Sequence, residues 1–303
     1  MRGVHGEKIA ALLVSSKLPD EDRPGVMEAL SVYDDWAEEI RTAKAKTLGE
    51  LITRLVASLN RYKFYVDLNL IFDSPKDFLY RQKGQLKLDN TVIEEFMSVF
   101  VRRCIEFEFG RCDVDIYPQS SIFSSIYFTS SLDRPELAGG LSIKTKDYDL
   151  SISRKIYLRS SYSPDFKPEE TLTLSANLGY ILAELKTNLD KTMFQEASAT
   201  ARDIKQVVPC AKYYLLCDYI DMTPISTATT DIDEILITRK AKRLSATIRK
   251  NYASREGRRD GRENYVQFLK QKPYCVDIFQ RFAEHVITHM TSKELAEDDV
   301  LEA

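Results

Sequence analysis

The sequence predicts an α/β fold, and three stretches of the chain carry that prediction. Residues 178–220 have the pattern of a strand, a helix and a second strand, and residues 111–161 alternate apolar and polar side chains as strands do. Most of the first 110 residues have the spacing of amphipathic helices. A chain of 303 residues can form one large domain or two small ones. We therefore expect an N-terminal helical region over 1–110 and a sheet-containing core over 111–303.

The stretch LGYILAEL, residues 178–185, is too short for a helix and rich in residues that favour strands. Residues 187–190 then supply Thr, Asn and Asp, which are good N-cap residues, and a helix is expected from about 191 to 206 with an alanine-rich face suited to packing on a sheet. Pro209 ends this helix. Residues 212–220, KYYLLCDYI, form a continuous apolar strand that predicts cover on both faces.

The N-terminal region predicts helices over 7–17, 24–44, 47–61 and 90–105. Strand patterns begin at 111 and include a long segment, LSIKTKDYDLSISRKIYLRSS, over 141–161. After residue 220, a short strand is expected at DEILI. A basic helix to about 252, an exposed loop at REGRRDGR and a terminal helical segment broken near 272 should follow, and the acidic end, EDDVLEA, is expected to fray.

Composition excludes several classes of protein. The five cysteines show no paired spacing, which predicts free thiols in a reducing, cytoplasmic setting, and no apolar run approaches the length of a membrane span. The net charge is only −3, but residues 238–262 hold ten Lys/Arg against two Asp/Glu. This block of +8 lies on a body that carries −11. Such a local basic segment is typical of a surface that contacts phosphates. The alternative interpretation is a solvated charged face that binds nothing.

A carboxylate, one residue and then a lysine occur three times, as Asp165-Phe-Lys167, Glu184-Leu-Lys186 and Asp203-Ile-Lys205. The first copy lies in a Ser/Pro-rich loop and the third in a predicted helix, where residues two apart diverge. The second copy ends an apolar strand, where residues two apart point to the same face. The carboxylate could hold a divalent ion and the lysine could reach the attacking water and a scissile phosphate. The alternative is a surface ion pair at a strand end.

Residues 183–226, AELKTNLDKTMFQEASATARDIKQVVPCAKYYLLCDYIDMTPIS, resemble the nuclease core of the PD-(D/E)XK type II restriction endonucleases. More narrowly, they resemble the BbvCI-like family, which cuts sites built around CTNAG, and the similarity extends over 147–161 and 230–244. The resemblance implies a restriction-endonuclease-like core, a mixed sheet flanked by helices. It also implies Mg²⁺-dependent, sequence-specific cleavage of double-stranded DNA, with Glu184 as a metal ligand and Lys186 beside the nucleophilic water. The N-terminal hundred residues are not covered.

An enzyme of this type requires a first metal-binding aspartate, and three residues qualify. Asp165 follows a proline but sits in a poor strand, whereas Asp147 and Asp149 precede a well-alternating one. If that strand and the strand ending at Glu184 form a hairpin, Asp149 returns to the same end as Glu184. We therefore favour Asp149 as catalytic and metal-binding, with Asp165 second, while each alone could be a surface aspartate.

In the basic block, the candidates for DNA contact are Lys240, Lys242, Arg243 and Arg249. The partners expected are double-stranded DNA and a second subunit, giving either a homodimer or a heterodimer with a related chain.

Two other functions remain open: a catalytically silent DNA-binding subunit, and a repair nuclease of the same fold that recognises DNA structure and not sequence. A zinc site at His285 and His289 lacks a third ligand and is set aside.

Overall fold

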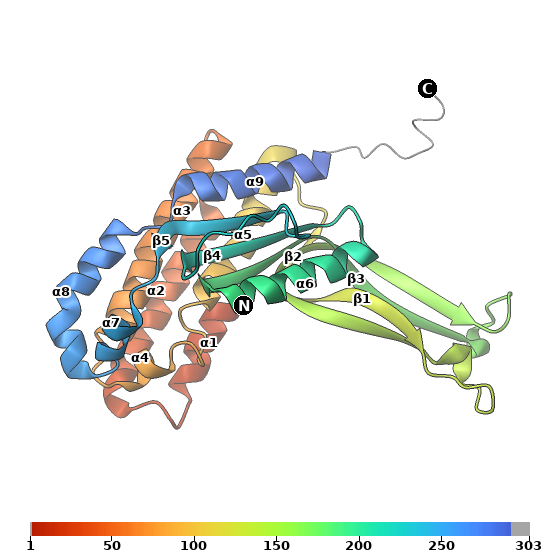
Figure 1. Cartoon of the computed structure of the whole chain (residues 1–303), viewed down its shortest axis with the longest axis horizontal. Helices are drawn as coiled ribbons and strands as arrows, with labels where there is room; N and C mark the ends of the chain where they lie inside the picture. Colours follow the sequence, from red (N-terminus) through yellow and green to blue (C-terminus); the bar gives the residue numbers. More distant parts are fainter. Residues whose placement is uncertain (1, 292–303) are drawn as a thin grey trace.

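The computed structural model describes residues 2–291, so the acidic end, EDDVLEA, lies outside the described residues. In Figure 1 a helical body forms one side of the molecule, a twisted sheet crosses the middle, and three long strands extend away from the helices as an arm. Within residues 2–291, none of the helices combines the length and the apolar character that a bilayer span requires.

The N-terminal region is helical, as the sequence predicts. Thr47 caps one of its helices by accepting a hydrogen bond from the Glu50 N–H, and Gly110 ends the last one with a left-handed φ of 72°. The elements are α1 (Val4–Leu13), α2 (Arg23–Thr42), α3 (Leu48–Tyr65), the π-helical η2 (Val66–Phe72), α4 (Phe78–Gln82) and α5 (Thr91–Phe109).

In the described residues the sheet has five strands in the order β1-β2-β3-β4-β5. β1, β2 and β3 are antiparallel neighbours, whereas β3, β4 and β5 run parallel, so the sheet is mixed. The strands are β1 (Asp115–Phe128), β2 (Leu141–Ser161), β3 (Thr171–Leu189), β4 (Lys212–Ile220) and β5 (Glu234–Lys242). The parallel strands all end on the side of the helical body (Figure 1), so polar residues at these ends gather there.

Two hydrophobic clusters cover the two faces of the central sheet. On one face, α6 (Lys191–Val207) packs its alanines against β3 and β4, and Asp190 caps the helix by accepting a hydrogen bond from the Met193 N–H. On the other face, the N-terminal helices and α9 (Val276–Thr291) share one continuous core with β2, β3 and β4. The remaining helices are α7 (Ala246–Asn251) and α8 (Arg255–Gln271).

The strand–helix–strand unit over 178–220 is confirmed, with β3 longer than expected. The segment after 234 differs from the prediction. β5 continues through Lys242, where a basic helix was expected, because its Thr238 and Ala241 side chains are buried in the sheet. The stretch REGRRDGR is the first part of α8 and not an exposed loop, because Ser254 caps that helix and its Arg258 is buried.

Candidate active site

The candidate active site lies where β2 and β3 separate. The last ladder pair between these strands toward the helical body is Leu150 with Ala183. One residue further, the Asp149 carboxylate accepts a hydrogen bond from the Leu185 N–H at 2.9 Å. The side chain thus takes the place of a backbone partner, and β3 continues beside β4 alone. The fork leaves room for polar side chains at a point that would otherwise be a closed sheet.

Glu184 and Lys186 point into this fork from β3, because residues two apart share a face of a strand. The Lys186 Nζ lies 3.2 Å from Glu184 Oε2 and 3.5 Å from Asp149 Oδ2. The side chains of Asp149 and Glu184 are 20% and 18% exposed, and that of Lys186 is 35% exposed. Three groups that the sequence singled out therefore meet in one half-buried cluster that remains open to solvent.

The charge state of Lys186 follows from its surroundings. Burial acts to lower the pKa of Lys186, but the carboxylates of Asp149 and Glu184 outweigh it, so the net effect raises the pKa. The lysine therefore pairs as a cation with the two carboxylates, where it can stabilise negative charge and orient a water molecule.

The other two aspartate candidates lie elsewhere. Asp165 follows β2 in the turn that joins it to β3, and that turn lies at the far end of the arm from Glu184. Asp147 forms a short hydrogen bond with Ser121 on β1 and has no contact with Lys186. Of the three aspartates, Asp149 is the one that the fold brings to the Glu184–Lys186 pair.

A second buried carboxylate stands behind Asp149. Glu94 on α5 is fully buried, and it accepts a hydrogen bond from the Gln119 side-chain amide at 2.6 Å. Gln119 has a left-handed φ of 53°. In the β1–β2 register it lies opposite Asp149, because the residues before and after it pair with the residues after and before Asp149. Burial raises the pKa of Glu94, and the Asp149 carboxylate adds to that effect. A strained residue thus links the helical body to the site.

Two tyrosines form the wall next to Glu184. The rings of Tyr148 and Tyr213 meet edge to face, with centroids 6.3 Å apart. Burial raises the pKa of the Tyr213 hydroxyl far above its usual value, and the Glu184 carboxylate adds to the shift. That hydroxyl is buried without a hydrogen-bond partner of good geometry within the described part of the chain. The Tyr213 hydroxyl is therefore a neutral hydrogen-bond donor beside the acidic cluster.

The fork meets the main requirement of a divalent metal site, which is a set of oxygen donors. The groups available are carboxylate oxygens, and a lysine ammonium already balances their charge at the position that a cation would share. Between residues 2 and 291, His, Cys, Asp and Glu side chains nowhere gather in a group of three that could hold a metal by themselves. Mg²⁺ is usually held by one or two carboxylates, with waters and substrate phosphates completing its shell. Asp149 and Glu184 fit that requirement.

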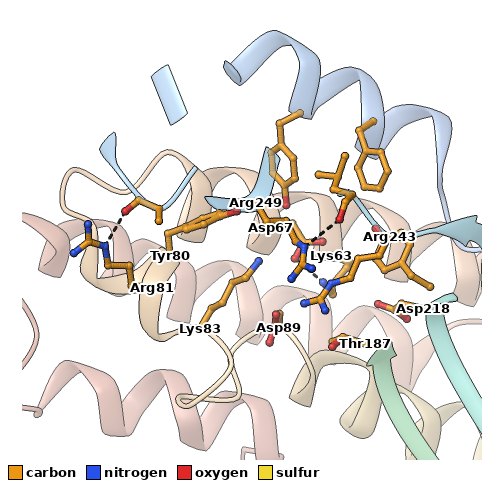
Figure 2. Close-up of a pocket in the computed structure, with 15 residues that line it drawn as sticks. Lys63, Asp67, Tyr80, Arg81, Lys83, Asp89, Thr187, Asp218, Arg243 and Arg249 are labelled. Carbon is orange, nitrogen blue, oxygen red and sulfur yellow. Dashed lines mark hydrogen bonds and ion pairs between the residues drawn. The ribbon is translucent and has the colours of Figure 1, made fainter. Parts of the chain in front are cut away.

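The four candidate DNA contacts separate into two places. Lys240 is exposed and forms a short ion pair with Asp277 at the start of α9. Lys242 is exposed at the end of β5. The hollow that it lines differs from the one lined by Arg243 and Arg249. Arg243 and Arg249 line one cavity together with Lys83, between the end of the parallel strands and α4 (Figure 2).

The basic block is not one solvated face. Arg258 is 2% exposed, and its guanidinium donates to the carbonyl oxygens of Phe72, Ser74 and Lys76. Arg239 is 5% exposed and lies between Asp67 and Asp218. These two arginines join α8 and β5 to the helical body, so part of the +8 charge has a structural role.

Sequence reasoning missed Glu94, Gln119, Tyr213 and Lys83. Glu94 has one recognisable signal, a charged residue on the apolar face of an amphipathic helix, because such a position is costly unless the group is paired or used. The others reach the site through tertiary contacts that no local pattern records.

Comparison with known proteins identifies the family. The model of the Bpu10I restriction endonuclease family matches residues 85–303, which is more than two thirds of the chain and includes α5. The structure described as the native BbvCI A2B2 tetramer at low resolution is similar in fold, with a TM-score of 0.52 and 15% sequence identity. That match covers 88% of this chain and 97% of the other. A search of curated proteins found no match. The fork with its two carboxylates and lysine lies inside the matched region, and the chain belongs to the Bpu10I family of type II restriction endonucleases.

Proposed function

We propose that Asp149, Glu184 and Lys186 form the catalytic centre of this enzyme and that Mg²⁺ is its cofactor. The observation that supports the proposal most directly is the position of the Lys186 ammonium, within 3.5 Å of both carboxylates at the fork of β2 and β3. A cluster of this kind, half-buried and open at one side, suits hydrolysis of a phosphodiester that enters from solvent.

Each residue has a distinct role. Asp149 and Glu184 hold the metal, which when bound polarises the phosphate and acidifies a water. Asp149 Oδ2 accepts from the Leu185 N–H and also lies 3.5 Å from the Lys186 Nζ, so the carboxylate is held at the site. Lys186 orients the attacking water and stabilises the negative charge that grows on the phosphate oxygens.

The residues around this centre supply support. Glu94 and Gln119 fix the position of β1 opposite Asp149 and keep a third carboxyl group close to it. The Tyr213 hydroxyl can donate to Glu184 when the lysine shifts toward the substrate. Supporting groups of this kind usually set the orientation of metal ligands.

We further propose that a boundary near residue 110 separates an N-terminal helical part from the nuclease core. Two catalytic centres in one assembly would cut both strands of a duplex in a single binding event, so we propose that a second subunit takes part. The similar BbvCI structure is described as an A2B2 tetramer, which makes a heteromeric assembly worth testing beside a homodimer. Duplexes built around CTNAG are the first targets to try.

Incubation with phage DNA and Mg²⁺ tests the proposed function. Discrete fragments that vanish in EDTA are expected from a sequence-specific enzyme with this centre. A smear would favour a repair nuclease that reads DNA structure. Binding without any cleavage, by the chain alone and with a related subunit, would favour a silent subunit and contradict the catalytic assignment.

A further inference from the structure

A cavity of about 340 Å³ lies between the helical body and the ends of the parallel strands. Its walls come from α3, α4 and the loop after it on one side, and from the segment after β5, α7 and α8 on the other, with the ends of β3 and β4 between them. Figure 2 shows Lys83 extending into this space from the α4 side, while Arg243 and Arg249 enter from the opposite wall. Segments more than 150 residues apart in the sequence thus build one basic cavity.

The charges that line the cavity do not cancel. Lys63 is neutralised by Asp67, with the two side chains 2.5 Å apart, and Asp218 is held by the Tyr274 hydroxyl at 2.9 Å. Over residues 2–291, Lys83 and Arg243 form neither an ion pair nor a hydrogen bond. The Arg249 guanidinium donates to the Leu244 carbonyl oxygen, and Arg81 pairs with Asp77 at 3.5 Å. Within the described residues that line the cavity, Lys83, Arg243 and Arg249 therefore face one carboxylate that forms no ion pair, that of Asp89.

The cations are partly withdrawn from water. Burial lowers the pKa of Lys83 and of Arg243, and neighbouring positive groups contribute to both shifts. One ring face of Tyr80 lies 4.8 Å from the Lys83 Nζ and keeps the ammonium directed inward. Unpaired cations in such a place have a free-energy cost that a bound anion would remove.

The cavity is next to the candidate active site. Thr187, which lines it, follows Lys186 on β3, so its side chain enters the cavity from the opposite face of the strand but at the same strand end. Asp89 lines it from the other side, and its neighbour Asn90 donates to Glu94 at 2.5 Å. A DNA strand carries one phosphate per about 3.4 Å of helix axis. Because the fork and the cavity share one end of β3, a strand with its scissile phosphate at the fork would present another phosphate at the cavity if it follows that end from one face to the other.

We propose that this cavity binds a backbone phosphate of the DNA strand being cut, a few nucleotides from the scissile bond, through Lys83, Arg243 and Arg249. The assignment rests on the proposed function, because it takes the position of the scissile phosphate from the Asp149–Glu184–Lys186 centre. Arginine forks can hold two phosphate oxygens and the lysine a third. The contact fixes the register of the strand in the site and carries no base specificity itself.

A double-mutant cycle between protein and DNA tests this contact. Single phosphates of a duplex are replaced in turn by neutral methylphosphonates, and binding is measured with wild type, Lys83→Met and Arg243→Gln. The duplex carries the mapped cut site of the wild type or, if it does not cut, the tightest binder from a random library. Lys212→Met is the control, since it removes one charge from the opposite end of β4.

At one position near the scissile bond, neutralisation should weaken wild-type binding about tenfold and Lys83→Met binding clearly less, because one of the three partners of that phosphate is already absent. Arg243→Gln should show the same pattern at that position, whereas Lys212→Met should behave as wild type. If the two losses multiply at every position, the cavity holds no DNA phosphate and the assignment is wrong.

A second measurement distinguishes a free anion from DNA. If inorganic phosphate raises the melting temperature of wild type but not of Lys83→Met, and the scan shows no coupling, the cavity takes a free anion, which also overturns the assignment. Cleavage by the wild type is read separately. An enzyme that cuts normally without coupling contradicts only this inference, whereas coupling without cleavage contradicts only the catalytic proposal.

Discussion

The Asp149 carboxylate accepts a hydrogen bond from the Leu185 N–H at 2.9 Å, at the point where the β2–β3 ladder ends. One side chain thus serves both the backbone of β3 and the candidate metal site. Because Leu185 lies between Glu184 and Lys186, this hydrogen bond also sets how Asp149 faces those two residues. The orientation of the proposed first metal ligand is therefore coupled to the opening of the sheet, and the site depends on the strand fork more than on any loop.

Asp149→Asn should abolish cleavage while leaving the fold intact. The asparagine oxygen can still accept from the Leu185 N–H, but the site loses the charge that a metal ligand supplies. We expect a rate loss of about 10²-fold or more, with DNA affinity nearly unchanged. The matched control is Asp165→Asn at the far end of the arm, which should cut at the wild-type rate. The opposite result for the two variants would move the metal site to Asp165.

Lys186→Ala should fold and bind DNA but cleave about 10²–10³-fold more slowly, equal to about 3–4 kcal/mol of transition-state stabilisation. The loss is expected because the variant lacks the ammonium that lies within 3.5 Å of both carboxylates. Single-turnover cleavage measures it. Lys205→Ala carries the same short sequence pattern on α6, where Lys205 pairs with Asp233, and it should retain activity. A wild-type rate for Lys186→Ala would exclude the lysine from the chemistry.

Removal of divalent ions should stop cleavage, and addition of Mg²⁺ or Mn²⁺ should restore it. Ca²⁺ should support binding without cutting, because it is larger and tolerates looser coordination than Mg²⁺. Fragment formation in EDTA and in each ion, followed on one duplex, is the measurement. Full cleavage in EDTA would contradict a centre that relies on Asp149 and Glu184 as metal ligands.

Stability should fall in mild acid because of His5. Burial first, and then the charge of Lys63, lower its pKa to about 3, while its ring nitrogens contact Thr91 and Tyr62. The unfolded chain binds a proton near pH 6.5 and the folded chain does not, so this group weakens the fold as pH drops between those values. Its contribution is about 1.4 kcal/mol per pH unit. The free energy of unfolding, measured in urea at several pH values from 7 to 5, should fall less steeply with pH for His5→Gln than for wild type.

Much of the central fold follows from local pattern. Short stretches of sequence are enough to predict the apolar runs of β3 and β4, the Asp190 cap and the alanine face of α6. All of them form as expected. The arginine-rich segment was less predictable, because whether Arg258 meets solvent or the carbonyls of Phe72 and Ser74 depends on a helix almost 190 residues away. A charged residue that satisfies buried carbonyls has the same sequence signature as one on the surface.

The candidate site divides in the same way. Glu184 and Lys186 could be selected because strand periodicity alone places them on one face. Asp149 required the register of β2 against β3, which hairpin logic could supply. The basic cavity could not be predicted, since Lys83 comes from a helix end and Arg243 from a strand end, and only tertiary packing joins them.

The pair of neighbouring buried carboxylates on α5 offers the last test. Burial raises the pKa of both Glu94 and Glu95, so the two residues share a physical character. Their partners differ: Glu94 accepts from Gln119 beside Asp149, whereas Glu95 accepts from the Tyr33 hydroxyl and the His5 N–H.

Glu94→Gln should therefore reduce cleavage or metal affinity by about 10–100-fold, the usual effect of altering a group behind a metal ligand. Its unfolding midpoint should move much less than that of Glu95→Gln, whose substitution removes one of the acceptor oxygens that join α1, α2 and α5. Metal titration and urea unfolding of the two variants separate these effects. If Glu95→Gln impairs cleavage as much as Glu94→Gln at equal stability, the link from Glu94 through Gln119 to the site has no special role, and α5 acts only as a scaffold.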